Sequence, residues 1–339
     1  MIWARHSRTG FYRIRPIFGD SSEVLAIRQF FHRPSPCLGS RMRSRGGAGK
    51  ESFEEGFVMI RGSCLCGAIR WALQGEPKRM THCHCRMCRK AHGATFATFL
   101  IGGNEGFRFE QGEGDIVGYE SSPDFIRPFC AHCGSVVPHR APDRVRIPAG
   151  AMDDDPGIRP SAHIYAKWKA PWHAIDDDLP KHDHFPGHST PRVEHPALSP
   201  STAGVLRGSC LCRKVAYEVS GPLQRLYHCH CSRCRKARGA AHATNAFAAM
   251  GDVRYLRGEE SLRTYRLPGA RTFSHVFCTA CGSGMPRLDP GRSLAVIPMG
   301  SVDDDPMRTI DSHIFVASKA PWYEIEDDIP RCAAAPDAS

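Results

Sequence analysis

The chain has 339 residues, sixteen of them cysteine, and a formal net charge of +10. Domains usually span about 100–200 residues, so this length predicts two of them and excludes a single small module. Ten Lys and Arg residues against two acidic ones in residues 1–50 supply +8 of the charge, and the nearly balanced remainder argues against a basic groove for nucleic acid.

Residues 1–58 form an Arg-rich leader that matches nothing later in the chain. Charged residues interrupt each of its apolar stretches, so it lacks the continuous apolar core of a secretory signal peptide. Its Arg, Ser and Gly content leaves little to bury, and we expect it to be disordered. No part of the chain approaches the ~18 apolar residues of a membrane-spanning helix. These features predict a cytoplasmic protein that does not enter membranes.

After the leader, one unit occurs twice. The motif RGSCLC at 61–66 returns at 207–212, and the HCHC motif that opens 82–91 returns at 228–237, both shifted by 146 residues. Later motifs recur at shifts of 148 and 150, which two small insertions explain. The predicted boundaries are 59–180 for the first repeat, 181–204 for a linker rich in Pro, Ser, Thr and His, 205–331 for the second repeat and 332–339 for a tail.

Within each repeat, short runs of β-forming residues predict strands. Examples are 68–73 and 94–101 in the first repeat and 214–219 in the second, which are separated from their neighbours by Gly, Pro and Asp. Only Cys88–Gly93 favours a helical turn. We therefore expect each repeat to be mainly β, with a small apolar core to which metal contributes part of the stability.

Fourteen cysteines lie in the repeats, seven in each, and their spacing divides each seven into four and three. Two outer pairs, each followed closely by Gly in the first repeat, can close a tetrahedral zinc site. The central three lie within six residues and leave the fourth position of zinc to water or substrate, as in catalytic sites. The predicted metal ligands are Cys64, Cys66, Cys130 and Cys133 with Cys83, Cys85 and Cys88 in the first repeat, and Cys210, Cys212, Cys278 and Cys281 with Cys229, Cys231 and Cys234 in the second.

This division predicts four Zn²⁺ ions per chain, two structural and two at sites with an open position. Thiols in short C-x-C and C-x-x-C pairs of a protein without a signal peptide more often bind metal than form disulfides. An alternative is that His82, His84 or a neighbouring residue completes the three-cysteine site, which would make every metal structural. The catalytic candidates are the two central sets, Cys83, Cys85 and Cys88 in the first repeat and Cys229, Cys231 and Cys234 in the second.

Basic residues beside the central cysteines suggest a partner for an anionic thiol. Zinc with three thiolates carries about −1, and a substrate thiolate makes this about −2, which requires nearby cations. Such cations could also bind the carboxylates of a peptide thiol. The residues in question are Arg86, Arg89 and Lys90 in the first repeat and Arg233, Arg235 and Lys236 in the second.

The motifs of the first repeat are Gly62–Gly67 (GSCLCG), Cys83–Lys90 (CHCRMCRK), Cys130–Gly134 (CAHCG), His163–Ile164 and Lys169–Trp172 (KAPW), and the second repeat carries matching ones. Together they resemble the glutathione-dependent formaldehyde-activating enzyme family, also named for centromere protein V, over nearly all of residues 61–330. The resemblance implies two tandem zinc-binding domains that are mainly β, with twisted antiparallel sheets and zinc knuckles. It also implies a structural zinc on the outer cysteine pairs and a second zinc on the central three.

For its best-known members, the resemblance implies condensation of formaldehyde with the thiol of glutathione, formally a carbon–sulfur lyase in reverse. The expected function is therefore a zinc-dependent enzyme acting on a small thiol and an aldehyde, and the alternative is a non-catalytic zinc-binding scaffold for a partner. The second repeat departs from the first where Arg238 replaces His92 and His242 replaces Phe96. We expect its pocket to differ in substrate or to have lost activity.

Overall fold

The computed structural model describes residues 58–123, 125–187, 198–201 and 204–335, which all belong to one structural unit. The expected leader lies outside the described residues apart from Val58, as do half of the expected linker and the last four residues of the tail. Contacts between the two repeats can be followed because both lie in the same unit.

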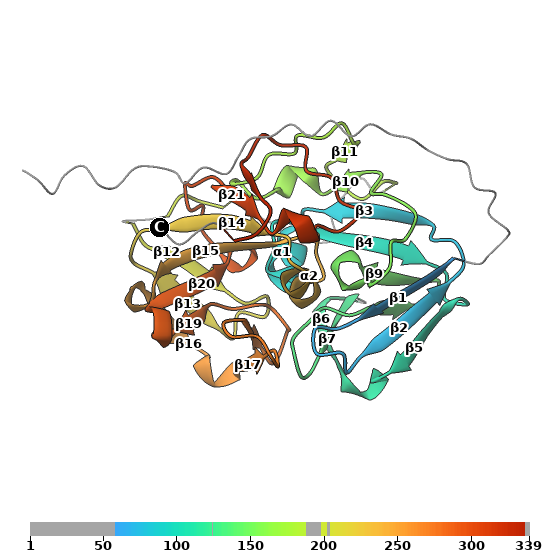
Figure 1. Ribbon diagram of the computed structural model, residues 1–339, viewed down its shortest axis with the longest axis horizontal. Coiled ribbons are helices and arrows are strands. Elements are labelled where there is room, and N and C mark those ends of the chain that lie inside the picture. The colour runs from blue at the N-terminus through green and yellow to red at the C-terminus, as the bar shows by residue number, and fades with distance from the viewer. Residues whose placement is uncertain (1–57, 124, 188–197, 202–203, 336–339) are drawn as a thin grey trace, which may run out of the picture. The chain divides into compact units, whose positions relative to one another are not determined.

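The first repeat folds into two sheets and a hairpin (Figure 1). The smaller sheet is antiparallel with the order β1-β2-β5, the larger has the order β11-β10-β3-β4-β9-β8, and β6 pairs with β7. The strands are β1 (Met59–Ser63), β2 (Arg70–Gln74), β3 (Arg79–Cys83), β4 (Ala97–Gly102), β5 (Phe107–Gln111), β6 (Ile116–Ser122), β7 (Phe125–Cys130), β8 (His139–Ala141), β9 (Arg144–Pro148), β10 (His163–Ile164) and β11 (Lys181–His182).

The second repeat has the same arrangement, with sheets β12-β13-β16 and β19-β20-β15-β14-β21-β22 and the hairpin β17-β18. The prediction of a mainly β protein in two tandem halves is confirmed. The strands are β12 (Leu206–Ser209), β13 (Ala216–Val219), β14 (Arg225–Cys229), β15 (Ala243–Ala249), β16 (Val253–Arg257), β17 (Leu262–Arg266), β18 (Ser274–Cys278), β19 (Arg287–Asp289), β20 (Leu294–Pro298), β21 (Ser312–Ile314) and β22 (Arg331–Cys332).

One edge of each larger sheet is parallel, which the expectation of antiparallel sheets did not include. Strand β10 runs parallel to both β3 and β11, and β21 does the same with β14 and β22. The parallel partner β11 consists of the first two residues of the expected linker, so backbone pairing continues past the end of the first repeat.

Each repeat has one short α-helix, α1 (Arg86–His92) or α2 (Ser232–Arg238). The sulfur of Cys85 caps α1 by accepting the N–H of Cys88 at 3.3 Å, and Gly93 ends it in the left-handed conformation, with φ of 58°. The helix therefore begins two residues before the predicted turn. No helix in the described part of the chain is long and apolar enough to cross a membrane.

Short 3₁₀ turns connect many of the strands, and two of them contact a helix of the other repeat. Helix α1 packs against η7 and α2 against η2, and the two helices lie side by side in Figure 1. The turns are η1 (Glu113–Asp115), η2 (Ala149–Ala151), η3 (Ala166–Trp168), η4 (Met250–Asp252), η5 (Glu259–Ser261), η6 (Pro290–Arg292), η7 (Met299–Ser301) and η8 (Val316–Ser318).

The basic residues of these helices bind the opposite repeat. The ammonium of Lys90 donates to the backbone oxygens of Ser209 (2.6 Å) and Ser301 (3.2 Å) and lies 2.9 Å from the carboxylate of Asp303. Arg86 pairs with the same Asp303. The prediction that these side chains hold a substrate carboxylate is therefore wrong for Arg86 and Lys90, because α1 directs them into the contact between repeats.

Of the matching residues of α2, Lys236 binds the opposite repeat and Arg233 packs within its own. Lys236 lies 2.5 Å from the carboxylate of Asp153 in the first repeat, and Arg233 lies over the ring of Phe273 at 5.5 Å. In α1, the remaining residue Arg89 is 3% exposed. The predicted basic clusters thus serve packing between and within the repeats.

The tryptophan of each KAPW motif packs into the hydrophobic core of the other repeat. Trp172, from the first repeat, belongs to the hydrophobic core built from Leu206, Val219 and other residues of the second repeat. Trp322, from the second repeat, belongs to the core of Ile60 and its neighbours in the first. Both indoles are nearly fully buried. Each core is therefore incomplete without a segment of the other repeat.

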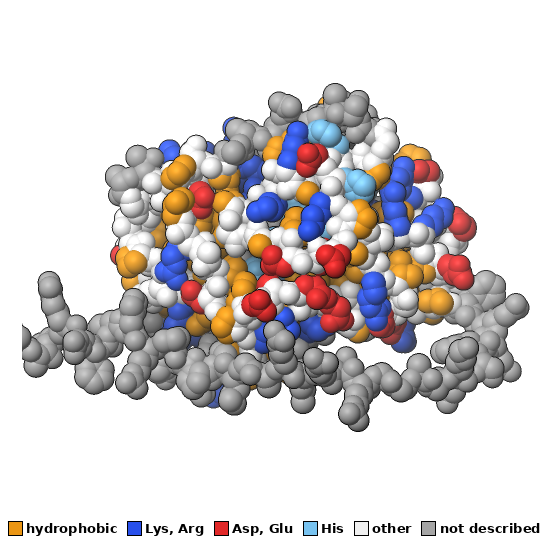
Figure 2. Space-filling view, turned by 90° about the horizontal axis from the view of Figure 1, so that it is seen from above, with side chains coloured by type: hydrophobic (Ala, Val, Ile, Leu, Met, Phe, Trp, Pro, Cys, Tyr) orange, Lys and Arg blue, Asp and Glu red, His pale blue; other side chains and the backbone are white. Residues whose placement is uncertain are grey.

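Figure 2 shows acidic side chains gathered just below the middle of the face, with basic side chains above, below and beside them. Hydrophobic atoms occur between them in separate small groups. Small separate apolar groups of this kind are usual on a solvated protein surface.

Candidate metal centres

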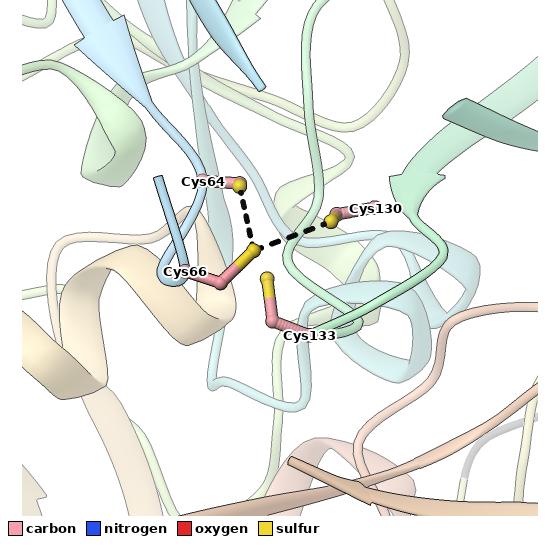
Figure 3. A group of neighbouring side chains, drawn as sticks. All are labelled: Cys64, Cys66, Cys130 and Cys133. Atoms are coloured by element: carbon pink, nitrogen blue, oxygen red, sulfur yellow. Dashed lines mark hydrogen bonds between the residues drawn. The ribbon is translucent and has the colours of Figure 1, made fainter. Parts of the chain in front are cut away.

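Four cysteines of the first repeat meet at one point (Figure 3). Cys64 and Cys66 lie in the turn after β1, and Cys130 and Cys133 lie at the end of β7 and in the turn that follows. The sulfur of Cys66 is 3.3 Å from that of Cys64 and 3.7 Å from that of Cys130, and all four sulfurs lie within 4.8 Å of one another. A tetrahedral zinc site with Zn–S bonds of about 2.3 Å has sulfur separations of about 3.8 Å, which these distances approach.

Backbone groups hold this site in shape. The N–H of Ile69 donates to the sulfur of Cys64 at 3.3 Å. Such a hydrogen bond fixes the direction of the sulfur and stabilises its thiolate form. Gly134 has φ of 72°, and a Cβ there would lie 2.3 Å from Phe277 of the second repeat. Glycine is thus required both for the turn and for the close approach of this ring.

The second repeat contains the same four-sulfur group. The sulfur of Cys212 is 3.4 Å from that of Cys210 and 3.8 Å from that of Cys278, with Cys281 within the same group. A Cβ on Gly282 would lie 2.6 Å from Phe129 of the first repeat. The contact seen at the first site is therefore repeated with the roles of the repeats exchanged.

Each four-cysteine site is also covered by the hairpin of the other repeat. Tyr265, on β17, packs against the cluster that contains Cys64 and Cys130, and Arg263 on the same strand donates to the backbone oxygen of Ala131 at 2.7 Å. Tyr119, on β6, packs against the core that contains the cysteines of the second site. These crossing contacts restrict solvent at both sites.

The three central cysteines of the first repeat surround the start of α1. Cys83 ends β3, Cys85 caps the helix and Cys88 lies in its first turn. Their sulfurs lie within 4.8 Å of one another and all three residues are buried. The second repeat matches this with Cys229, Cys231 and Cys234. The structure thus brings together every sequence-predicted set, and each set has the donors and spacing to hold a metal ion.

The two histidines beside Cys83 do not complete its group. His82 shares a hydrogen bond of 2.8 Å between Nδ1 and the hydroxyl of Thr98, and His84 shares one of 2.7 Å between Nε2 and Nδ1 of His163. His163 in turn contacts the carboxylate of Asp177 at 2.9 Å. Among the described residues, no histidine nitrogen or carboxylate joins the three sulfurs within 4.8 Å. The geometry therefore favours a three-ligand site.

An arginine that sequence reasoning missed lies against this site. Arg127, on β7, is buried and its Nη1 donates to the sulfur of Cys88 at 3.6 Å. Burial acts to lower the pKa of Arg127, but the thiolates of Cys88 and Cys85 more than offset this and raise it. Hydrogen bonds from Cys83 and Cys85, together with the charge of Arg127, lower the pKa of the Cys88 thiol. These contacts favour the thiolate form of Cys88, whereas hydrogen bonding with the neighbouring thiols and burial raise the pKa values of Cys83 and Cys85.

A small pocket of about 20 Å³, partly open to solvent, adjoins Arg127. Its wall includes His92 from α1, Arg146 from β9 and three phenylalanine rings, and Cys281 and Gly282 of the second repeat close one side. Burial lowers the pKa of His92 to about 4, so this side chain is neutral at pH 7. The pocket thus combines apolar walls with two guanidinium groups, and its size suits one small polar group of a ligand that extends into solvent.

The corresponding space in the second repeat contains a side chain. Arg238, at the position of His92, is buried and its Nη1 lies 2.9 Å from Nε2 of His275, which occupies the position of Arg127. The guanidinium lies so close to Gly284 that a Cβ there would be 1.5 Å from it. In the first repeat this position is Val136, which lines the pocket. Several substitutions together therefore place Arg238 where the first repeat has a pocket.

The family model for the glutathione-dependent formaldehyde-activating enzyme matches residues 59–168 and 205–318. These two segments make up more than half of the chain. The chain belongs to this family. A crystal structure of a Rhodobacter sphaeroides protein is 29% identical over 27% of this chain and 83% of that one, with a TM-score of 0.23. Membership of the formaldehyde-activating family confirms the resemblance found in the motifs of both repeats.

For this member of the formaldehyde-activating family we expect four zinc ions per chain. Fourteen free thiols are gathered in two groups of four and two of three, and thiolate sets of this kind select zinc. Elemental analysis of protein purified without chelator is the measurement. A reproducible value near two would contradict the prediction, because it would leave one class of site without metal.

Proposed function

We propose that the protein is a zinc-dependent enzyme that condenses an aldehyde such as formaldehyde with a small thiol such as glutathione. In the direction of cleavage this is a carbon–sulfur lyase. The observation that carries the proposal is the set of three buried sulfurs at Cys83, Cys85 and Cys88, which has no fourth ligand among the described residues. Arg127 contacts one of these sulfurs and also lines a small pocket. Family membership supports the proposal.

The two kinds of cysteine site and the residues around them have different roles in this proposal. The four-cysteine sites serve as structural zinc sites, because they are saturated by protein ligands. Zinc held by the three central cysteines would act as a Lewis acid toward the thiol or the aldehyde oxygen at its open position. Arg127 offsets the negative charge of the thiolates through its contact with Cys88. Phe99, Ile164 and Tyr165 pack around the cysteines and limit the access of water.

We assign the activity to the first repeat. Its pocket is open, whereas Arg238 and His275 pair in the corresponding space of the second repeat. The second repeat keeps all seven cysteines, and this combination favours a structural, non-catalytic role for it. The many unpaired thiols are consistent with the reducing cytoplasm, where we place the protein.

The test is magnetisation exchange by NMR between free glutathione and its hydroxymethyl adduct, with formaldehyde present. We expect the purified protein to accelerate the exchange and zinc-stripped protein to lose this effect. Replacing Cys83 and Cys85 with serine should reduce the acceleration at least about tenfold, since removing ligands of a catalytic metal removes its chemistry.

The matched control is the double substitution of Cys229 and Cys231 with serine in the second repeat. We expect it to retain most of the acceleration. Full acceleration in the first-repeat variant would show that the assignment to that repeat is wrong. Equal loss in both variants, with folding intact by circular dichroism, would indicate a shared site instead.

A further inference from the structure

The pocket beside the three-cysteine site of the first repeat has an unbalanced charge. Arg127 and Arg146 both line it, and its lining contains no Asp or Glu. Neither guanidinium forms an ion pair with a carboxylate of the described residues. Cationic pockets without their own carboxylate are suited to an anionic ligand.

We propose that Arg146, assisted by Arg127, binds a carboxylate of the thiol substrate in this pocket. The inference rests on the proposed function, and it names the residues that bind the carboxylate of such a thiol. It also assigns specificity to two residues that lie on β9 and β7, far in sequence from the metal ligands.

Arg127 is fixed in place by contacts on two sides. Its Nε donates to the hydroxyl of Ser121 at 2.9 Å, and its Nη1 contacts the sulfur of Cys88. Much of its charge therefore serves the thiolates, and it connects the metal ligands with the wall of the pocket. A carboxylate near Arg127 would leave the thiol of the same ligand close to the three-cysteine site.

Arg146 contacts aromatic rings, whereas Arg127 forms hydrogen bonds with Ser121 and Cys88. Its guanidinium lies 4.2 Å from the ring centroid of Phe125 and 5.8 Å from that of Phe99. Stacking on rings holds the plane of a guanidinium while leaving its N–H groups at the edge available. Those N–H groups are the donors that a carboxylate binds through two parallel hydrogen bonds. The rings thus orient Arg146 toward a planar anion.

The second repeat has lost both arginines and one of the two rings, and keeps only Phe273 at the position of Phe125. Val296 replaces Arg146. The two positions are equivalent because Val296 pairs with Phe247 and Arg146 pairs with Ile101 in the same register of the sheet. His275 replaces Arg127, and Asn245 replaces Phe99. The second repeat still has its three central cysteines. The arginine pair therefore does not follow simply from a need to neutralise three thiolates, which both repeats share.

The experiment separates carboxylate binding from turnover by using S-methylglutathione, whose blocked thiol cannot react. Its affinity for the zinc-loaded full chain is measured by calorimetry and compared with that of its diethyl ester, which lacks the negative charges. We expect the free acid to bind at least about tenfold more tightly, a difference of about 1.4 kcal/mol. Arg146→Gln should reduce this ratio to near one, with the zinc content unchanged.

Arg144→Gln is the matched control, because it removes the same charge from the same strand but at a residue that does not line the pocket. It should leave the ratio as in the unmodified protein. If Arg146→Gln weakens the binding of the acid and of the ester equally, or changes neither affinity, the inference is overturned. Catalysed exchange in the same samples would then show that the proposed function still stands. An Arg146-dependent ratio without catalysed exchange would uphold the inference and overturn the proposed function. Failure of the unmodified protein to bind the acid would also overturn the inference.

Discussion

Replacing Cys64 with serine is expected to unfold the first repeat. A structural zinc site contributes on the order of 10 kcal/mol to folding in small zinc domains, which is comparable to the entire stability of an ordinary domain, about 5–15 kcal/mol. Cys64 is 1% exposed and lies within the group of four sulfurs. Thermal unfolding followed by circular dichroism, with zinc content measured in parallel, should show an early transition and the loss of at least one ion.

The control for this substitution is His132→Ser, in the loop between Cys130 and Cys133. His132 is exposed and contacts only the exposed carboxylate of Asp115 among the charged residues described, a contact that contributes little to stability. It should leave both measurements unchanged. Cys85→Ser, at the three-cysteine site, should lower the melting temperature less than Cys64→Ser. An equal drop in the two cysteine variants would mean that the two classes of site are alike and structural.

Substituting Trp172 with alanine is expected to destabilise the second repeat although the residue belongs to the first. Removing a fully buried tryptophan costs about 3–5 kcal/mol, and the core that loses contacts is that of Leu206 and Val219. Hydrogen exchange of backbone amides locates the effect. Protection should fall most in β12, β13 and β16.

Trp322→Ala is the mirror experiment and serves as the control. Its indole packs in the core that contains Ile60 and Trp71, so protection should fall most in β1, β2 and β5. If each substitution instead loosened mainly the repeat that carries it, the exchange of core segments would not describe the protein in solution. A uniform loss in both variants would show that the two repeats unfold as one cooperative unit.

Much of the site could be predicted because metal ligation requires particular side chains at close spacing. The pairs at Cys64/Cys66 and Cys130/Cys133 are 64 residues apart, yet their chemistry and flanking glycine predicted the group that the structure brings together. The short strands were also predictable from runs of β-forming residues. The change from His92 to Arg238 identified the second repeat as different, and the structure supplies the cause in the contact of Arg238 with His275.

Other features depend on which segments meet in space, and local sequence patterns do not report that. Lys90 lies beside the ligand Cys88 in sequence, but the orientation of α1 directs it to Asp303 in the other repeat. Arg127, by contrast, lies 39 residues from Cys88 and contacts it directly. The packing of Trp172 in the core of the second repeat could not be predicted either, because the sequence around a buried tryptophan does not indicate which core it enters.

Because Trp172 and Trp322 each pack in the core of the other repeat, the two repeats stay joined while their sequences differ. In a symmetric dimer of identical chains, a substitution such as His92 to Arg would appear at both sites at once and remove both pockets. Here the two halves share one polypeptide, so Arg238 changes only one of them while Trp172 and Trp322 keep them joined. One half is then free to accumulate substitutions that favour packing, and the other can retain its opening to solvent. Under the proposed function, the interlocked cores thus join one repeat that keeps its pocket to one whose corresponding space is filled by Arg238.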